Sequence, residues 1–324
     1  MCTALNYTPD DHYFGRNLDL EFSYQESVTI TPRKFPLPLR RTAPLTIHYA
    51  MIGMAYVVDN YPLYYDATNE AGLSMAGLNF PEYAIYREEN PVLNNIAPFE
   101  LIPWVLGQCA DLEQTRQCLL RLNLIDLSFS PELPLTPLHW IVSDASGSIT
   151  VEPLADGLHI YDNPTGVLTN SPPFDWQMTN LRNYLSLTRE TPENRFSDTL
   201  RLSPYSRGMG AMGLPGDWSS SSRFVRAAFL AQNAHSGPGE ASHVHQLFHM
   251  LSGVAMPQGC IHLGQEQFER TVYSSCCNTR KGIYYYTTYE NQQITAVDLH
   301  KVPLDGESLF SYPLLRTPQF RMQN

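Results

Sequence analysis

The amino-acid sequence predicts an α+β fold in which two β-sheets are stacked between outer layers of helices. Strand patterns dominate the first part of the chain, helical patterns become frequent in the middle, and strands return near the C-terminal end. Separate runs of strands and helices are typical of this class, whereas regular alternation would indicate a parallel sheet. No internal repeat, low-complexity tract or linker divides the 324 residues, so we expect one domain over 1–324.

The chain is expected to open with a β-hairpin. Residues 2–8 and Tyr13–Leu20 both have the composition of strands, and a Thr-Pro-Asp-Asp sequence between them supplies turn residues. Because paired strands bring residues that are distant in sequence side by side, the hairpin would place Arg16 and Asp19 within reach of Cys2.

Further strands are expected where apolar, aromatic and β-branched residues run between turn residues. Gly72 closes one of these turns, where a positive φ costs glycine little. The predicted strands are Val28–Pro32, Ile47–Val58, Leu63–Ala67, Leu73–Asn79, Leu138–Ser143, Ser148–Glu152, Leu158–Tyr161, Val167–Asn170, Arg270–Cys277, Gly282–Tyr286 and Gln293–Leu299.

Helices are expected where apolar residues recur with a period near 3.6. The apolar residues of Phe174–Leu185 are spaced i, i+4, i+7 and i+11, and Asp111 followed by Gln114 is typical of a helix start. The predicted helices are Pro98–Cys109, a segment that begins at Asp111, Phe174–Leu185, a segment from near Ser222 through Phe229, and a segment from Ser242 to near Leu251.

The composition is that of a globular protein with a sparsely charged, acidic surface. Charged residues make up 16%, and 21 Lys and Arg against 32 Asp and Glu give a net charge of −11. Without clustered Lys and Arg, no nucleic acid partner is expected, and the acidic balance disfavours an anionic membrane surface. No segment has the roughly eighteen apolar residues that span a bilayer, and the charged start resembles no signal peptide. We therefore expect a cytoplasmic protein without membrane insertion.

One of the six cysteines has an unusual position. Cys109 and Cys118 lie in apolar helical surroundings and are expected to be buried, reduced thiols. Cys2 follows Met1 directly, so removal of Met1 would give one residue both a thiol and a free α-amine, whose ordinary pKa is about 7.7–8.0. On this stretch alone, chance placement of Cys2 is the simpler interpretation.

A glycine-rich match and a serine cluster are better explained by ordinary structure than by a site. Residues 208–213 match G-x-G-x-x-G, but Pro215 and Gly216 follow at once and exclude the helix that would bind a pyrophosphate. Ser219–Ser222 is typical of a helix N-cap. Arg223 then falls in the first helical turn, where the helix dipole disfavours a cation, and this hints at a function.

The histidines suggest a metal site only weakly. His245 and His249 would share one helix face with His243 nearby, but their apolar neighbours are typical of helix packing. We therefore expect no metal. His139 and His262 stand alone, and their sequence context indicates no role.

Several motifs, in order along almost the whole chain, match one known family. They are Met-Cys-Thr at the start, Phe14–Asp19, Asn69–Leu73, Ala76–Phe80, Leu168–Asn170, Leu214–Asp217, Ser222–Phe224 and Tyr273–Ser275. On these residues the sequence resembles the choloylglycine hydrolases, which include conjugated bile salt hydrolases and the related penicillin V acylases. The resemblance implies an N-terminal nucleophile hydrolase of αββα architecture, with two mostly antiparallel sheets between helix layers.

The resemblance also implies a catalytic role for the hairpin. Cys2, exposed by removal of Met1, would be the nucleophile, and its own α-amine would be the base. Arg16 would lie beside the sulfur and favour the thiolate. Asp19 would hold and orient the amine.

Three more catalytic residues are implied from the rest of the chain. The backbone N–H of Asn79 and the side-chain amide of Asn170 would form an oxyanion hole, and Arg223 would complete the charged network. Asn79 also favours bile salts as substrates, since penicillin V acylases tend to carry tyrosine at the matching position.

The implied reaction is hydrolysis of glycine- or taurine-conjugated bile salts through a thioester, without metal or cofactor. Hydrolysis of penicillin V or another N-acyl amide is the alternative, and binding of an amphipathic ligand without turnover is a second one. Family members are commonly tetramers, so a homotetramer is expected by analogy. A steroid needs an apolar pocket, although apolar loop residues often only pack. The candidate walls are Leu20, Phe22, Ile125, Leu127 and Phe129.

Overall fold

The computed structural model describes residues 1–324 and contains two large antiparallel β-sheets. The first sheet has the strand order β12-β1-β2-β15-β16-β17, so strands from both ends of the chain are neighbours. Its members are β1 (Cys2–Tyr7), β2 (Tyr13–Leu20), β12 (Val167–Leu168), β15 (Arg270–Asn278), β16 (Ile283–Thr288) and β17 (Thr295–Asp298).

The second sheet has eight strands in the order β11-β10-β9-β6-β5-β4-β3-β18. Its members are β3 (Ser27–Thr31), β4 (Met51–Val58), β5 (Tyr61–Asn69), β6 (Ser74–Asn79), β9 (Leu138–Asp144), β10 (Gly147–Leu154), β11 (Gly157–Asp162) and β18 (Phe310–Pro313). Two small pairs lie outside the large sheets. They are β7 (Asn94–Ile96) with β8 (Leu122–Leu124), and β13 (His262–Gly264) with β14 (Gln267–Phe268).

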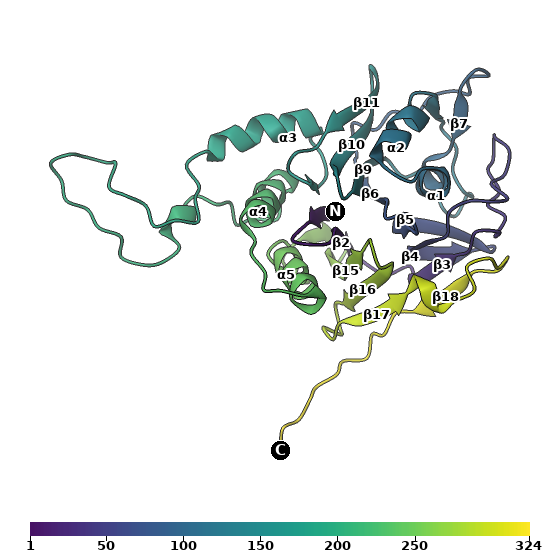
Figure 1. Cartoon of the computed structure of the whole chain (residues 1–324). Coiled ribbons are helices and arrows are strands. Elements are labelled where there is room, and N and C mark those ends of the chain that lie inside the picture. Colours follow the sequence, from purple (N-terminus) through teal and green to yellow (C-terminus); the bar gives the residue numbers. More distant parts are fainter.

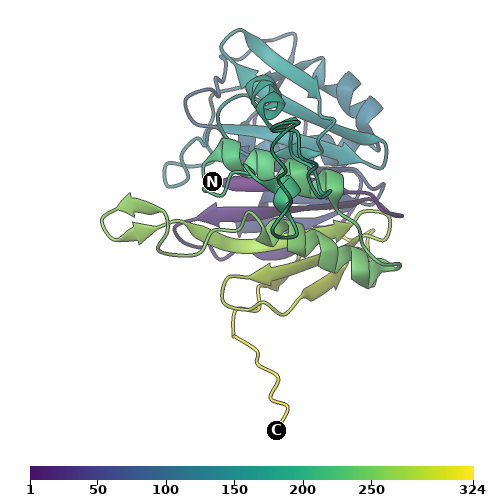
Figure 2. The same ribbon diagram turned by 90° about the vertical axis from the view of Figure 1, so that its left-hand side faces the viewer.

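Helices cover the outer face of each sheet (Figure 1). On the first sheet, α4 (Ser220–Asn233) packs against β1, and α5 (Glu240–Ser252) packs against β2 and β15. On the second sheet, α1 (Leu101–Gln108) packs against β5 and β6, and α2 (Leu112–Leu119) packs against β9 and β10. The two sheets lie between these helix layers, which Figure 2 shows from the side of α4 and α5. This order of layers confirms the predicted fold class.

Strand alternation supplies apolar side chains to two separate cores. Ile52 and Met54 of β4 belong to a cluster of 32 buried residues between the sheets and beneath α4 and α5. Met51 and Ala55 of the same strand belong to a cluster of 23 buried residues beneath α1 and α2. Successive side chains of a strand point to opposite faces, so a strand buried on both faces contributes to both layers.

The opening hairpin is confirmed, and its register places the N-terminus inside the first sheet. Cys2 lies opposite Leu18, and Ala4 lies opposite Arg16. The ladder continues to Met1, whose backbone oxygen accepts from the Asp19 backbone N–H at 2.9 Å. Because β12 pairs with the other edge of β1, the nucleophile candidate begins an interior strand.

Several predicted elements differ from the observed ones at their ends; the strand predicted over Val167–Asn170, for example, covers only Val167–Leu168. The strand predicted over Ile47–Val58 begins only at Met51, because the backbone N–H groups of His48 and Tyr49 bond to Arg33 O and Gly107 O instead of to a strand. The small pairs and β18 were missed altogether.

The helix predicted over Phe174–Leu185 also ends early. Its α-helical part, α3, is Phe174–Leu181, and the 3-10 turn η2 (Arg182–Tyr184) follows. The side chain of Leu185 is 85% exposed, since the chain leaves the body of the molecule here. Residues 185–218 form a long arm that extends away from the sheets and returns at α4 (Figure 1).

A buried histidine gives the fold a defined pH response. His12 bonds through its two ring nitrogens to the hydroxyls of Ser143 (2.9 Å) and Thr279 (3.1 Å), and burial lowers its pKa from 6.5 to about 4. The unfolded chain therefore takes up a proton first as the pH falls. We expect the free energy of unfolding to decrease between pH 6.5 and pH 4, by up to about 3 kcal/mol from this residue.

Urea denaturation at several pH values measures this contribution. The variant His12→Gln, which does not titrate, is expected to show a shallower loss of stability over the same pH range than the wild type. Parallel pH dependences of the two proteins would contradict the prediction.

Candidate active site

Cys2 lies at the start of β1, buried between the sheets and α4 with a side-chain exposure of 4%. Its backbone N–H donates to Asn170 Oδ1 at 2.9 Å, and its carbonyl oxygen accepts from the guanidinium of Arg223. The structure contains Met1, so the nitrogen of Cys2 is here a peptide nitrogen. Both polar groups of the Cys2 backbone are thus held by predicted site residues.

Arg16 lies on the same face of the hairpin as Cys2, because its partner Ala4 is two residues further along β1. The guanidinium is completely buried, and its Nη1 donates to the carbonyl oxygens of Tyr65 and Gly77 at 2.8 Å each. Burial alone would lower the pKa of Arg16, but the negative charges of the Cys2 sulfur and other neighbours outweigh burial and raise it. Arg16 is therefore a permanent cation that can stabilise a thiolate.

Asp19 has one carboxylate oxygen bonded and one free. Oδ1 accepts from the hydroxyl of Thr271 at 2.6 Å, whereas Oδ2 is buried without a hydrogen-bond partner. Burial raises the pKa of Asp19, although the nearby charge of Arg223 acts in the opposite direction. A buried oxygen without a partner is costly, so this atom is well suited to accept from a further donor.

The N-terminal amine is held beside Asp19. The amine of Met1 donates to the backbone oxygen of Asp19 at 2.7 Å and forms an ion pair with the carboxylate of Glu269. Burial raises the pKa of Glu269, while the adjacent amine opposes that shift. The hairpin therefore delivers the start of the chain to an acidic environment, where the Met1 amine contacts the backbone oxygen of Asp19.

Asn79 and Asn170 are brought together from different elements. Asn170 follows β12, and its Nδ2 donates to the carbonyl oxygen of Asn79, the last residue of β6, at 2.6 Å. The N–H of Phe80 bonds to Pro137 O toward β9, so by strand alternation the N–H and C=O of Asn79 face the other way, toward Asn170. The Asn170 amide therefore lies next to the backbone of Asn79, on the side of β6 that faces away from β9.

Arg223 connects these parts through four acceptors. Besides the Cys2 carbonyl, its guanidinium donates to Thr3 Oγ1 (2.7 Å), Asn170 Oδ1 (2.7 Å) and Trp218 O (3.0 Å). The side chain is completely buried, and burial lowers its pKa despite the charge of Asp19. This explains a cation in the first turn of α4, where the helix dipole alone would disfavour it.

Sequence reasoning missed Thr271 and Glu269. Thr271 belongs to β15, and Glu269 is the residue before that strand. Thr271 lies directly opposite Asp19 in the pairing of β15 with β2. Neither residue stands in a recognisable motif, so only the pairing of strands some 250 residues apart could have revealed them.

A family model described as "Linear amide C-N hydrolases, choloylglycine hydrolase family" matches residues 2–312. The chain belongs to this family. Its members hydrolyse linear amide C–N bonds, as the description of the family states.

Relatives that are similar in sequence over nearly their whole length agree with the family match. The chain is 51% identical to a bile salt hydrolase/transferase of Lactiplantibacillus plantarum over 100% of both chains. It is 40% identical to a bile salt hydrolase/transferase of Clostridium perfringens over 98% of both chains. The first relative matches the whole length of the chain and the second matches 98% of it.

Solved structures of the family agree with the fold. A mutant of the conjugated bile acid hydrolase from Clostridium perfringens superposes with a TM-score of 0.92, at 39% identity and with 100% of each chain covered. Penicillin V acylase from Agrobacterium tumefaciens superposes with a TM-score of 0.75 over 96% of this chain and 90% of its own, at 20% identity. The second likeness concerns the fold alone.

The five candidate pocket walls have different surroundings. Phe129 packs edge to face on Phe99, with ring centroids 5.2 Å apart, and lies beneath the guanidinium of Arg40. Phe22 is largely exposed and contacts Tyr24. Leu20 and Leu127 are partly buried. Ile125 is only 2% exposed and lies in the interior.

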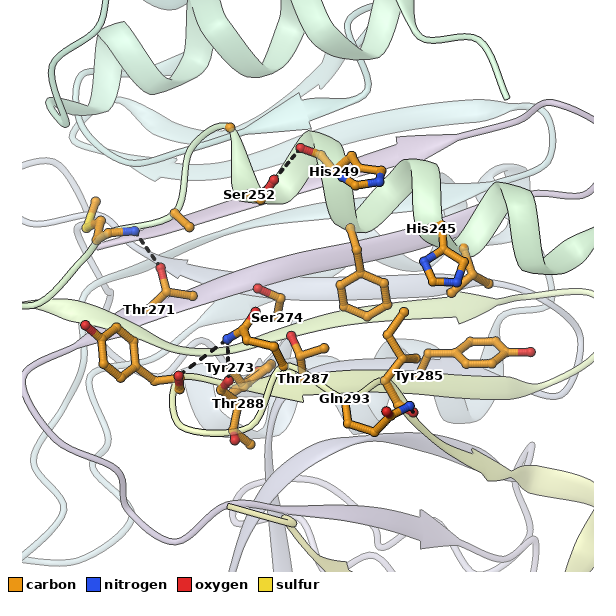
Figure 3. A pocket seen from close by; sticks show the side chains of 18 of the residues that line it. His245, His249, Ser252, Thr271, Tyr273, Ser274, Tyr285, Thr287, Thr288 and Gln293 are labelled. Atoms are coloured by element: carbon orange, nitrogen blue, oxygen red, sulfur yellow. Dashed lines mark hydrogen bonds between the residues drawn. The ribbon is translucent and has the colours of Figure 1, made fainter. Parts of the chain in front are cut away.

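Two cavities lie elsewhere in the molecule, and none of the predicted site residues lines either. A groove of about 1270 Å³ runs between α5 and strands β15 and β16, where His245 and His249 face Tyr285 and Thr287 (Figure 3). A smaller one of about 500 Å³ lies beside the first turn of the chain.

Two negative findings concern metals and membranes. No group of three or more His, Cys, Asp or Glu side chains is placed to hold a metal ion. None of the helices combines the length and the apolar character that crossing a bilayer requires.

Proposed function

We propose that this chain hydrolyses the amide bond of glycine- or taurine-conjugated bile salts, with Cys2 as the nucleophile after Met1 has been removed. The observation that carries the proposal is the position of Cys2 within the buried cluster of Arg16, Asp19, Asn170 and Arg223. The names of the full-length relatives, two bile salt hydrolases at 51% and 40% identity, supply the substrate class.

In the first step the Cys2 thiolate attacks the amide carbonyl carbon, and the carbonyl oxygen becomes an oxyanion. The Asn79 N–H and the remaining Nδ2 hydrogen of Asn170 are the donors that would stabilise it, and the hydrogen bond between the Asn170 amide and the Asn79 carbonyl supports this pairing by placing the two residues side by side. The α-ammonium group of Cys2 gives its proton to the departing nitrogen of glycine or taurine, and the C–N bond breaks. A thioester of the bile acid remains on Cys2.

In the second step water attacks the thioester. The α-amine of Cys2 takes the proton of the water, the C–S bond breaks, and the bile acid leaves as a carboxylic acid. Asp19 Oδ2, buried and without a partner, is the acceptor that would hold this amine in place. Arg16, a buried cation, would favour the thiolate that returns. In both steps the α-amine of Cys2 is the group that gives or takes the proton.

The test is release of amine and acid from taurocholate, glycocholate and penicillin V by the purified protein, together with its intact mass. We expect the mass of a chain without Met1 and faster turnover of the bile salts than of penicillin V. Faster turnover of penicillin V would favour the acylase alternative. A retained Met1 with no turnover would favour a protein that only binds an amphipathic ligand.

We further infer that the protein is a homotetramer in which the arm, residues 185–218, contacts another subunit. Large apolar side chains are exposed on it, Phe196 at 80% and Tyr205 at 81%, and such exposure is typical of an interface. Sedimentation of the wild type is expected to give a tetramer, and the double change Phe196→Ser, Tyr205→Ser is expected to give smaller species. A wild-type monomer would contradict the inference.

The compartment is proposed to be the cytoplasm. All six cysteines are unpaired, which is typical of a reducing environment. Cell fractionation checks this, and recovery of the activity from the culture medium would contradict it.

A further inference from the structure

His139, a residue without an assigned role in the sequence motifs, is bonded at both ring nitrogens inside the core. It lies on β9 with no exposed surface, and its Nδ1 is 2.9 Å from Glu152 Oε1 on β10. Its Nε2 is 3.1 Å from the backbone oxygen of Thr169. The Thr169 carbonyl oxygen can only accept, so Nε2 carries a hydrogen, and Nδ1 shares a second hydrogen bond with the Glu152 carboxyl group.

The contacts of this ring lead to both sides of the candidate oxyanion hole. The ring stacks on Phe80, with centroids 4.1 Å apart and planes 6° apart, and Phe80 is the residue after Asn79. The carbonyl that the ring holds belongs to Thr169, the residue before Asn170. One side chain is therefore in contact with the immediate neighbour of each proposed oxyanion donor.

Glu152 extends the same bridge to the segment that follows Asn170. Its two carboxylate oxygens each lie 3.1 Å from the N–H of Phe174, the first residue of α3. Glu152 is completely buried, and these contacts fix the start of the helix that ends the loop. The loop 169–174 is thus held at both ends by the His139–Glu152 pair.

We propose that His139 and Glu152 are a positioning pair that sets the distance between the Asn79 N–H and the Asn170 amide. The inference rests on the proposed amide hydrolysis, because the two donors matter only when a tetrahedral oxyanion forms. The donors of an oxyanion hole act on the transition state, and loss of one typically lowers kcat about 10²–10³-fold. A displacement of about 1 Å costs about 10²-fold.

The pair should therefore affect kcat and leave substrate binding nearly unchanged. In His139→Gln the side chain can bond only one of the two partners of the ring, and in Glu152→Gln one carboxyl oxygen is replaced by an NH2 group, which cannot accept from the Phe174 N–H. We expect kcat to fall about 10- to 100-fold in each variant, with KM within about twofold of the wild type. Thermal denaturation of the same samples reports how much stability each change removes.

His12→Gln is the matched control, because His12 is also a buried histidine bonded at both ring nitrogens, and it does not touch the site. We expect it to lower the melting temperature while kcat per folded molecule is preserved. A His139→Gln protein whose kcat per folded molecule equals that of the wild type would overturn the proposal. So would a loss of kcat in His12→Gln as large as that in His139→Gln.

A double-mutant cycle gives a readout that a purely structural role would not move. If His139 acts through Asn170, the effect of His139→Gln on kcat should largely disappear in an Asn170→Ala background. Additive effects would overturn the proposal. The variants are assayed on whichever of glycocholate and penicillin V the wild type hydrolyses faster, so a wrong substrate class and a wrong positioning role give different results. Absence of wild-type turnover on both substrates would contradict the proposed function and the positioning role together.

Discussion

Cys2→Ala is expected to reduce amide hydrolysis by about 10⁶-fold, which is the scale of loss when the nucleophile of an amide hydrolase is removed. The buried thiols of Cys276 and Cys277 are not placed to replace it, since they lie opposite Gly15 and Phe14 of β2, whereas Cys2 lies opposite Leu18. Alanine is as small as cysteine, so Met1 should still be removed and the loss should not arise from failed processing. Intact mass and turnover of glycocholate, measured on the same sample, test both statements.

Cys260→Ala is the control for this change, because Cys260 is a free and exposed cysteine outside the cluster. We expect the control to keep full activity. Acid quenching of the wild type during turnover should also give a species heavier by one bile acyl group, and this species should be absent in Cys2→Ala. Equal release of amine by the wild type and Cys2→Ala would refute the mechanism.

Arg223→Leu is expected to damage both stability and catalysis. The guanidinium bonds to oxygens of Cys2, Thr3 and Asn170 and is the opposite charge that most favours ionised Asp19 in this buried cluster. Removing one partner from a buried pair of charges typically costs about 3–5 kcal/mol of stability. The loss of the bond to Asn170 should further lower kcat of the molecules that remain folded. Urea denaturation and kinetics on the same preparation separate the two effects.

The same helix offers a closely matched control for this prediction. Arg226, one turn further along α4, is also buried and donates to the carbonyl oxygens of Gly253, Pro215 and Asp217, none of which touches Cys2. We expect Arg226→Leu to lose stability but to keep kcat per folded molecule. If the two variants have the same kcat, then Arg223 serves the fold alone.

The parts of the site that could be predicted from the sequence are those set by short-range pairing. The register of β1 and β2 follows from strand alternation around a short turn, so strand patterns alone were sufficient to place Arg16 and Asp19 near Cys2. Arg223 could be singled out because a cation conflicts with the first turn of a helix. The roles of Asn79 and Asn170 came instead from the family motifs.

The remaining contacts depend on pairings that no local pattern specifies. Thr271 meets Asp19 because β15 pairs with β2, and His139 meets Glu152 and Thr169 because β9, β10 and the loop after β12 converge. An isolated histidine in a strand has the same sequence signature whether it is solvated, structural or positioning. The start of the arm was also unpredictable. The helical spacing of apolar residues continues to Leu185, whereas helix α3 ends at Leu181 and Leu185 is exposed.

The burial of the N-terminus within an interior strand has a practical consequence for recombinant production. An affinity tag fused before Cys2 would occupy the place of the partly buried Met1 beside Asp19 and Glu269 and would convert the amine into an amide. The other end of the chain has no such constraint, because the last residues extend away from the body of the molecule and are exposed (Figure 1). Purification handles, fluorophores and surface-attachment chemistry therefore belong at Asn324.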